Sequence, residues 1–328
     1  MLLESELFDA EFYLDANPDV ARAGIDPVDH YLWSGASEGR RPHPRYDAAW
    51  YRTNNPDVGD ANPLIHYLEV GRREGRKIQK PVVVYTAIFG GYDRLRPPIH
   101  PDPDIDHIVF ADDLLVEVPG PWIRLRNPNR FEGNRRTSRY FKTHAHELFP
   151  GYEFSVWIDG AFQLRNLTAE CIGPALGTND IAFFRHPWRN CAYEEAAADM
   201  RHQLDSPERI ASAVDQLKAH QYPENSGLVE AGVIVRRQDV PSLVSAMEEW
   251  WQMILNGSQR DQLSINFVLW KHQIRSGILP GSSRRDKWVY WMGHRPTGWD
   301  DVEKWSRFLE NEILDLQATI ENCGAKPA

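Results

Sequence analysis

The chain has 328 residues and a formal net charge of −10, with 47 acidic residues against 37 lysines and arginines. Proteins that bind nucleic acid normally carry a basic surface, so this balance argues against a nucleic-acid partner. The length predicts about two domains. The longest apolar run, residues 82–89, is too short to cross a bilayer, and no signal-like segment opens the chain.

The positions of the cysteines indicate the redox state of the compartment. Cys171, Cys191 and Cys323 are scattered and never form a Cys-x-x-Cys pair. This pattern argues against a disulfide framework or a structural zinc site and fits a reducing compartment. We therefore expect a cytoplasmic protein, or one peripheral at the inner face of a membrane.

An internal repeat occupies the first part of the chain. Residues 8–20 recur as residues 46–58, each with an Asn-Pro-Asp-Val sequence, and His-Tyr-Leu at 30–32 recurs at 66–68. Each copy predicts two short helices, separated at Asn-Pro and ended by a glycine. A unit of this period needs neighbours to bury its apolar side. His30 and His66 are candidate ligands, but polar residues that satisfy buried backbone groups are the simpler interpretation.

A second domain is predicted to begin after the polar linker 77–81. Residues 82–89 form a continuous apolar run, which is typical of a strand covered on both faces. Gly90 and Gly91 then turn the chain and would let a ligand approach the backbone. A second strand over 106–110 precedes Asp112, which fits contact with a ribose or base, or equally a solvated turn.

A cationic helix is predicted next, from residue 134 through 146. Arg135, Arg139 and Lys142 fall at positions that share one helical face. Directed into a crevice, this face would bind a diphosphate. Directed at water, it would be an ordinary charged surface.

Residues 154–158 form an apolar strand that ends in Asp159 and Gly160. Open α/β sheets bind ligands outside the carboxyl ends of their strands, so Asp159 is a candidate site residue. A turn or cap aspartate after an ordinary core strand is the alternative.

The densest polar cluster follows a strand predicted at 180–184. His186, Arg189, Glu194 and Glu195 lie within ten residues of its end. Buried charges need partners, so such a cluster normally lines a polar cleft. A helix N-terminus would explain the two glutamates but not His186 or Arg189.

Three further elements complete the prediction. A strand edged by glycines over 225–237 carries Glu230, and a tryptophan-rich helix spans 240–255. Asp261 precedes a helix at 265–271, where it could cap the helix or face an acceptor hydroxyl. Residues 302–320 predict an amphipathic helix that packs on the body of the protein or on a partner.

Five motifs in this order resemble a glycosyltransferase-like family, first described as a domain of unknown function. The family occurs in bacterial surface-polysaccharide loci and in plant proteins linked to pectin and mucilage. The resemblance covers residues 82–295 and is carried by residues 87–93, 157–159, 186–196, 227–230 and 260–264. It implies an α/β fold: a GT-A-like, Rossmann-like mixed sheet flanked by helices.

The domain prediction follows from the motifs and the repeat: a helical repeat module at 1–78, the transferase domain at 79–298, and a C-terminal helix and tail at 299–328. The repeat itself resembles one found beside bacterial glycosyltransferase domains. That resemblance implies a spacer module, or one that docks other polysaccharide-assembly proteins.

The resemblance implies a nucleotide-sugar donor and a glycan acceptor. Asp261 is the first candidate for the catalytic base, followed by Glu230 and Glu195. The implied nucleotide-sugar-binding residues are Thr86, Phe89, Gly90, Gly91, Tyr92, Asp112, Arg135, Arg139, Lys142, Asp159, His186, Arg189 and Glu194.

The resemblance does not decide whether the site binds a metal ion. Asp159 stands where GT-A enzymes have a metal-binding Asp-x-Asp motif, but here the sequence reads Asp159-Gly160-Ala161. Mg²⁺ and Mn²⁺ prefer several oxygen ligands, so a single carboxylate makes a sparse site. His294 or His186 is the candidate that would complete it.

The sequence is compatible with three functions. The first is transfer of a sugar from a nucleotide diphosphate to a glycan hydroxyl, inverting or retaining. The second is a decayed scaffold that binds a glycan or nucleotide without turnover. The third is a hydrolase with paired carboxylates, but the adjacent Glu194 and Glu195 do not face each other on a helix.

Overall fold

The computed structural model describes residues 2, 5–115, 117–126, 131 and 133–294. The amphipathic helix predicted at 302–320 lies outside the described residues. Within the described ranges, no helix has both the length and the apolar character that a bilayer span requires.

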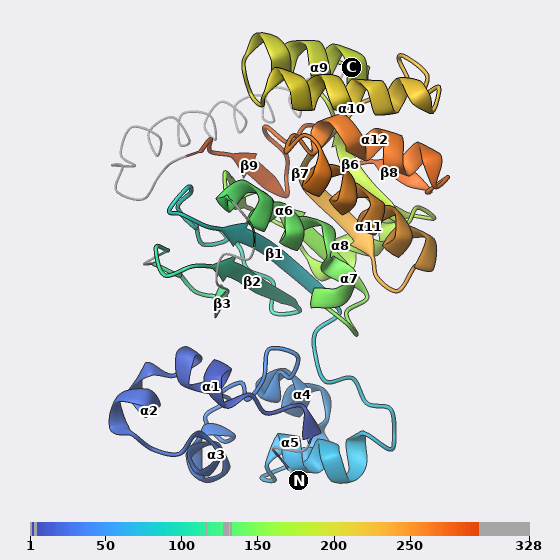
Figure 1. Ribbon diagram of the computed structural model, residues 1–328. Coiled ribbons are helices and arrows are strands. Elements are labelled where there is room, and N and C mark those ends of the chain that lie inside the picture. Colours follow the sequence, from blue (N-terminus) through green and yellow to red (C-terminus); the bar gives the residue numbers. More distant parts are fainter. Residues whose placement is uncertain (1, 3–4, 116, 127–130, 132, 295–328) are drawn as a thin grey trace, which may run out of the picture.

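The first part of the chain is helical (Figure 1). Asp9 and Asp47 cap equivalent helices by accepting from the backbone N–H three residues on, at 3.0 and 2.9 Å. Each copy contains more helical pieces than the two predicted, because a glycine with positive φ, Gly24 or Gly59, ends the middle piece. The pieces are α1 (Ala10–Ala16), α2 (Pro18–Ala23), α3 (Pro27–His30) and η2 (Tyr31–Gly35), then α4 (Ala48–Asn54), η3 (Pro56–Val58), α5 (Pro63–His66) and η4 (Tyr67–Gly71).

The two copies share the same internal hydrogen bonds. Tyr13 Oη lies 2.9 Å from His30 Nδ1, and Tyr51 Oη lies 3.1 Å from His66 Nδ1. Asn17 donates to the carbonyl of Tyr13 at 2.7 Å, and its counterpart in the second copy makes the same bond. Both histidines therefore have structural partners, which favours the simpler interpretation of the repeated polar residues.

The larger part is a mixed sheet of seven strands in the order β3-β2-β1-β4-β7-β6-β8. β7 runs antiparallel to β4 and β6, whereas β3, β2, β1 and β4 pair in parallel, as do β6 and β8. The strands are β1 (Val82–Ile88), β2 (Ile105–Ala111), β3 (Ile123–Arg126), β4 (Phe154–Ile158), β6 (Ile181–Arg185), β7 (Val229–Arg237) and β8 (Ser276–Ile278). This confirms the predicted α/β class.

Both faces of the sheet are covered, as the continuous apolar strands predict. In β1, Val83 and Tyr85 pack with one helical layer, and Val82 and Val84 pack against the other side. The first layer contains α6 (Asn134–Thr143), α7 (Ala145–Leu148), α11 (Pro241–Asn256) and α12 (Gln262–Lys271). The second contains α8 (Ala169–Leu176) and a small sheet of β5 (Phe162–Leu164) with β9 (Val289–Trp291). Helices α9 (Ala192–Arg201) and α10 (Pro207–Ala219) pack beside α12 at one end of the sheet.

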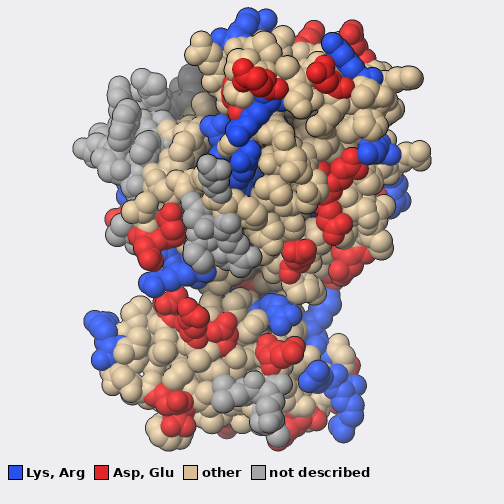
Figure 2. Space-filling view, viewed as in Figure 1, with Lys and Arg blue, Asp and Glu red and all other residues tan. Residues whose placement is uncertain are grey.

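A buried ion pair joins the helical part to the sheet. Arg41 lies 2.5 Å from both Asp47 and Asp106, and the Tyr152 hydroxyl donates to Asp106 at 2.6 Å. The adjacent carboxylates hold the pKa of Arg41 above its usual value despite its burial. The module boundary predicted at 78/79 falls between η4 and β1. On the face shown in Figure 2, acidic and basic side chains are interspersed over both parts.

Candidate active site

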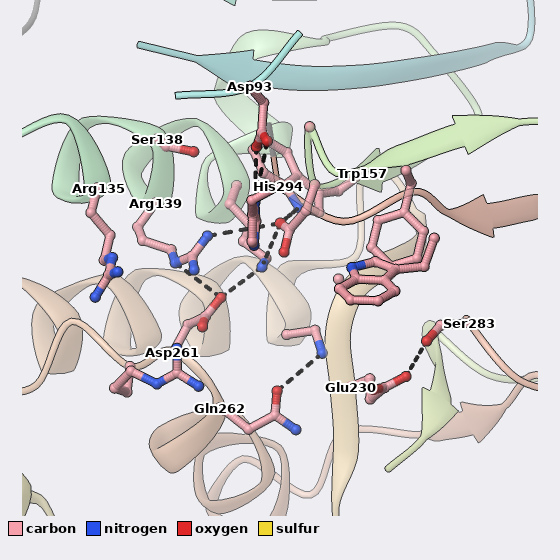
Figure 3. Close-up of a pocket in the computed structure, with 18 of the residues that line it drawn as sticks. Asp93, Arg135, Ser138, Arg139, Trp157, Glu230, Asp261, Gln262, Ser283 and His294 are labelled. Carbon is pink, nitrogen blue, oxygen red and sulfur yellow. Dashed lines mark hydrogen bonds and ion pairs between the residues drawn. The ribbon is translucent and has the colours of Figure 1, made fainter. Parts of the chain in front are cut away.

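A cavity of about 350 Å³ opens at the edge of the sheet where β1, β4 and β6 end. Open α/β sheets bind ligands at this edge. Because β7 runs in the opposite direction, its first residues, including Glu230, reach the same edge. Helix α6 and the start of α12 close the cavity from the side, and Figure 3 shows Arg135 and Arg139 of α6 and Asp261, the residue before α12, beside it.

Lys142 lies at the base of this cavity and is 1% exposed. Its ammonium donates to Asp261 at 2.6 Å and to Asp159 at 3.1 Å, and it sits 5.5 Å above the ring of Trp157. Burial, together with the positive charge of Arg139, lowers the pKa of Lys142. A buried charge of this kind is tolerated because two carboxylates compensate it.

Asp261 belongs to the same ion-pair network. Its carboxylate also lies 3.1 Å from Nε of Arg139. Burial opposes ionisation, but the charges of Arg139 and Lys142 hold the pKa of Asp261 well below its usual range. Although Asp261 immediately precedes α12, its side chain does not cap that helix. Its carboxylate is committed to the cations instead.

Asp159 follows β4, as predicted, and its backbone N–H donates to Gly232 on the neighbouring strand. Its Oδ1 accepts from the indole N–H of Trp157 at 2.7 Å and from Lys142. Arg139 lies 3.8 Å away. Hydrogen-bond donors and positive charges of the protein therefore surround Oδ1 of Asp159.

The other candidate metal ligand is also engaged. His294 Nδ1 lies 3.1 Å from Asp93, and this hydrogen bond raises the pKa of His294. Ala161, which replaces the second acid of Asp-x-Asp, is 1% exposed. Among the described residues, no three His, Cys, Asp or Glu side chains gather into a metal-binding group. The donors present do not fit a resident Mg²⁺ or Mn²⁺.

The cluster after β6 forms a second charged network on the cavity wall. Arg189 donates to Glu195, and His186 Nε2 lies 3.6 Å from the same carboxylate. Arg260 donates to Asp199 at 3.2 Å, and burial raises the pKa of Asp199. Burial lowers the pKa of His186. Glu195 is thus surrounded by cationic and hydrogen-bonding partners.

Glu230 occupies a different part of the cavity. It accepts a hydrogen bond from the hydroxyl of Ser283, and Arg284 lies 3.4 Å from its other oxygen. The residue is 9% exposed. In Figure 3, Glu230 and Ser283 lie on the side opposite Arg135. The cavity therefore has a cationic end and an end with a hydrogen-bonded carboxylate.

Most of the predicted site residues line this one cavity. They are Phe89, Tyr92, Arg135, Arg139, Lys142, Asp159, His186, Arg189, Glu195, Glu230, Asp261 and His294. The shared face predicted for Arg135, Arg139 and Lys142 is thus directed into the crevice.

Other predicted residues lie away from the lining. Thr86 is fully buried within β1, and Glu194 is exposed on α9. Asp112 accepts from the backbone N–H of Gly90 at 2.7 Å and of Leu114 at 3.1 Å. It therefore connects the end of β2 to the Gly90–Gly91 turn that follows β1.

Several lining residues were not predicted: Asp93, Asn134, Ser138, Trp188, Arg260, Gln262, Ser283, Arg284 and Trp291. The sequence around some of them indicated a site, since Arg260 and Gln262 flank Asp261, and Trp188 lies in the polar cluster after β6. No such neighbouring motif pointed to Ser283, Arg284 or Trp291. They come from the segment before β9 and from β9 itself, whose position depends on the long-range pairing of β5 with β9.

The chain was compared with curated proteins, with solved structures and with models of protein families. No curated protein matches the chain. Among solved structures, it is similar to one described as the apo structure of the WbbM bifunctional glycosyltransferase, with 13% sequence identity and a TM-score of 0.36. The similarity covers 82% of this chain, which spans 58% of that one.

The family comparison is more specific. The model of the "TOD1/MUCI70, glycosyltransferase-like domain" matches residues 119–279. This range contains β4, β6 and β7 together with α6 and α12, and hence most of the residues that build the cavity. Residues 119–279 are therefore similar to the TOD1/MUCI70 glycosyltransferase-like domain, and this similarity covers the segments that build most of the cavity.

Proposed function

We propose that this cavity transfers a glycosyl group from a nucleotide diphosphate sugar to a hydroxyl of a glycan, on a GT-A-like fold. The observation that carries the proposal is the cationic face of α6: Arg135, Arg139 and Lys142 all line a cavity that also contains Glu230. A departing diphosphate needs positive charge, and an attacking hydroxyl needs a proton acceptor.

The leaving group is assigned to the cationic end. When the bond between the anomeric carbon and the diphosphate oxygen breaks, the electron pair and the negative charge remain on the diphosphate. Arg135 and Arg139 would bind it, and Lys142, which lines the same cavity, would add a third positive charge. Lys142 is shielded from water, so its charge acts in a weakly screened environment.

Glu230 is the proposed base if the reaction inverts. It would accept the proton of the acceptor hydroxyl while that oxygen bonds to the anomeric carbon. Asp261, the first candidate from the sequence, is less suitable because Lys142 and Arg139 lower its pKa and occupy its carboxylate. Glu195 is also less suitable, because Arg189, His186 and Arg260 all lie within 4.0 Å of its carboxylate, whereas Arg284 is the one cation that pairs with Glu230 among the described residues.

No step is assigned to a metal ion. Asp159 is better interpreted as a partner that keeps Lys142 protonated and in place. The structure thus supports a site in which side-chain cations, rather than Mg²⁺ or Mn²⁺, neutralise the diphosphate.

We further propose that the reaction belongs to the synthesis of bacterial surface polysaccharide in the cytoplasm. The sequence resemblance of the repeat module and the scattered cysteines support this setting. The repeat module would then dock other proteins of polysaccharide assembly.

Calorimetric titration with UDP, GDP, CMP and dTDP tests the donor site. Each nucleotide is titrated once in the presence of Mn²⁺ and once in the presence of EDTA. One nucleotide should bind in both conditions, and Arg139→Ala should weaken it. Lys271→Ala is the matched control, because Lys271 pairs with Glu249 and does not line the cavity. If no nucleotide binds, the transferase proposal fails. If one binds but its sugar nucleotides are never turned over, even with glycans present, the protein is a binding scaffold.

A further inference from the structure

An exposed tryptophan stands at the mouth of the cavity. Trp188 is 70% exposed, although it lines the same cavity as Glu230. The guanidinium of Arg284 lies 5.2 Å from the centre of its ring and 4.3 Å from that of Trp291. Arg284 therefore contacts both indole rings, and a large part of Trp188 remains open to solvent.

The local backbone holds this arrangement in place. His186 Nδ1 accepts from the backbone N–H of Trp188 at 3.3 Å and of Arg189 at 3.0 Å, which fixes the loop after β6. On the other side, the backbone N–H of Trp291 donates to the carbonyl of Arg284 at 3.2 Å. The two segments that carry the aromatic rings are thus preorganised rather than loose surface chain.

Arg284 also links the aromatic rings to the proposed base. One of its nitrogens lies 3.4 Å from Glu230, whose other oxygen is held by Ser283. A molecule resting on Trp188 would therefore lie near the carboxylate end of the cavity. The cationic end at Arg135 lies on the opposite side (Figure 3), where the donor diphosphate is assigned.

The chemistry of this surface fits one class of ligand. An open indole face next to a carboxylate and a guanidinium offers an apolar plane with hydrogen-bonding groups at its edge. A pyranose ring has the complementary form, with an apolar C–H face and hydroxyls around its rim. A single exposed hydrophobic residue is common on protein surfaces and does not by itself indicate a binding site. Trp188 differs from such a residue because it lies at a polar cavity and an arginine stacks on its ring.

We propose that Trp188, supported by Arg284, is a sugar-binding subsite that stacks a pyranose ring of the acceptor glycan. Binding of the sugar follows from this geometry alone. Its role as acceptor, with a hydroxyl presented to Glu230, rests on the proposed function.

Saturation-transfer NMR on the full chain tests the subsite. The probes are the methyl pyranosides of glucose, galactose, mannose, N-acetylglucosamine and galacturonic acid. At least one should receive saturation from the wild-type protein. Trp188→Ala should abolish that signal, and Trp188→Phe should retain part of it because a ring face remains.

Trp33→Ala is the matched control, because Trp33 is 75% exposed and lies in the helical part, away from the cavity. This variant should keep the full signal. Equal signals from the wild type and Trp188→Ala would overturn the proposal, as would the absence of signal from all five sugars with the wild type. Nucleotide binding is measured separately by calorimetry. Sugar binding at Trp188 without any nucleotide binding would therefore contradict the transferase proposal but not the subsite.

Discussion

Lys142 and Asp261 form a buried ion pair with a distance of 2.6 Å, although 119 positions separate them in the sequence. The pair joins the end of α6 to the residue before α12, and Lys142 also lies 3.1 Å from Asp159. It therefore connects the packing of two helices to the charge of the cavity. Removing either partner should affect both stability and ligand binding.

The first prediction concerns Lys142→Met. This substitution leaves Asp261 buried without its closest cation, so we expect the free energy of unfolding to fall by about 3 kcal/mol. Nucleotide affinity should fall as well. Urea denaturation and calorimetry measure the two effects.

The double variant Lys142→Met with Asp261→Asn separates these effects. Neutralising both partners should recover much of the lost stability, because no uncompensated charge remains, but nucleotide affinity should stay low. If the double variant recovers both properties, Lys142 is only a structural cation.

The second prediction concerns Glu230→Gln. The amide cannot accept the acceptor proton, so kcat for glycosyl transfer should fall by about 100-fold or more. Glu194→Gln is the control, because Glu194 is exposed on α9 and outside the cavity. A Glu230→Gln enzyme with unchanged kcat would mean that the reaction needs no base at this position, as in a retaining mechanism.

The third prediction is a pH dependence of stability that arises from His107. Burial in β2, reinforced by the charge of Lys80, lowers the pKa of His107 from 6.5 to about 4. The folded state thus favours the neutral ring, and the stability it contributes is present above pH 6.5. That contribution is lost as the pH falls from 6.5 to 4, by roughly 3 kcal/mol for a shift of this size.

His107→Phe should therefore flatten the loss of stability between pH 6.5 and 4, since phenylalanine cannot take up a proton. Urea denaturation at pH 7 and pH 4.5 gives the comparison. His202→Phe on the surface is the matched histidine control. An acid sensitivity that is the same in wild type and His107→Phe would exclude His107 as its source.

The fourth prediction concerns the glycines of the repeat. A Cβ at Gly35 would collide with the Tyr13 hydroxyl, and one at Gly71 would collide with the Tyr51 hydroxyl. Gly35→Ala should lower the melting temperature of the helical part. Adding Tyr13→Phe removes the colliding hydroxyl and should restore part of the loss. If Tyr13→Phe makes the Gly35→Ala protein still less stable, the collision is not the cause.

Local sequence was sufficient for much of the site. The shared face of Arg135, Arg139 and Lys142 follows from helical periodicity, and the position of Asp159 follows from an apolar strand that ends in an acid. Both signals are contained within one element, so they can be predicted without knowledge of the fold. The helical character of the repeat could also be predicted from local sequence. The short helical pieces that end at Gly24 and Gly59 were not predicted.

The pairing of charges was decided by tertiary structure alone. Whether Asp261 acts as a base or as a counterion depends on Lys142 and Arg139, which approach it only when α6 packs beside α12. The partner of Asp112 also depends on tertiary structure, because the turn after β1 supplies the backbone N–H of Gly90 that donates to it. Periodicity within one element carries no information about such partners.

The sequence by itself thus determined which side chains could reach a ligand, because strand ends and helical faces are local properties. The tertiary structure decided how they combine. Antiparallel β7 brings Glu230 to the edge where parallel strands end, and the pairing of β9 with β5 brings Trp291 and Arg284 beside Trp188. Strand order and direction are set by packing over the whole domain, so no local pattern contains them.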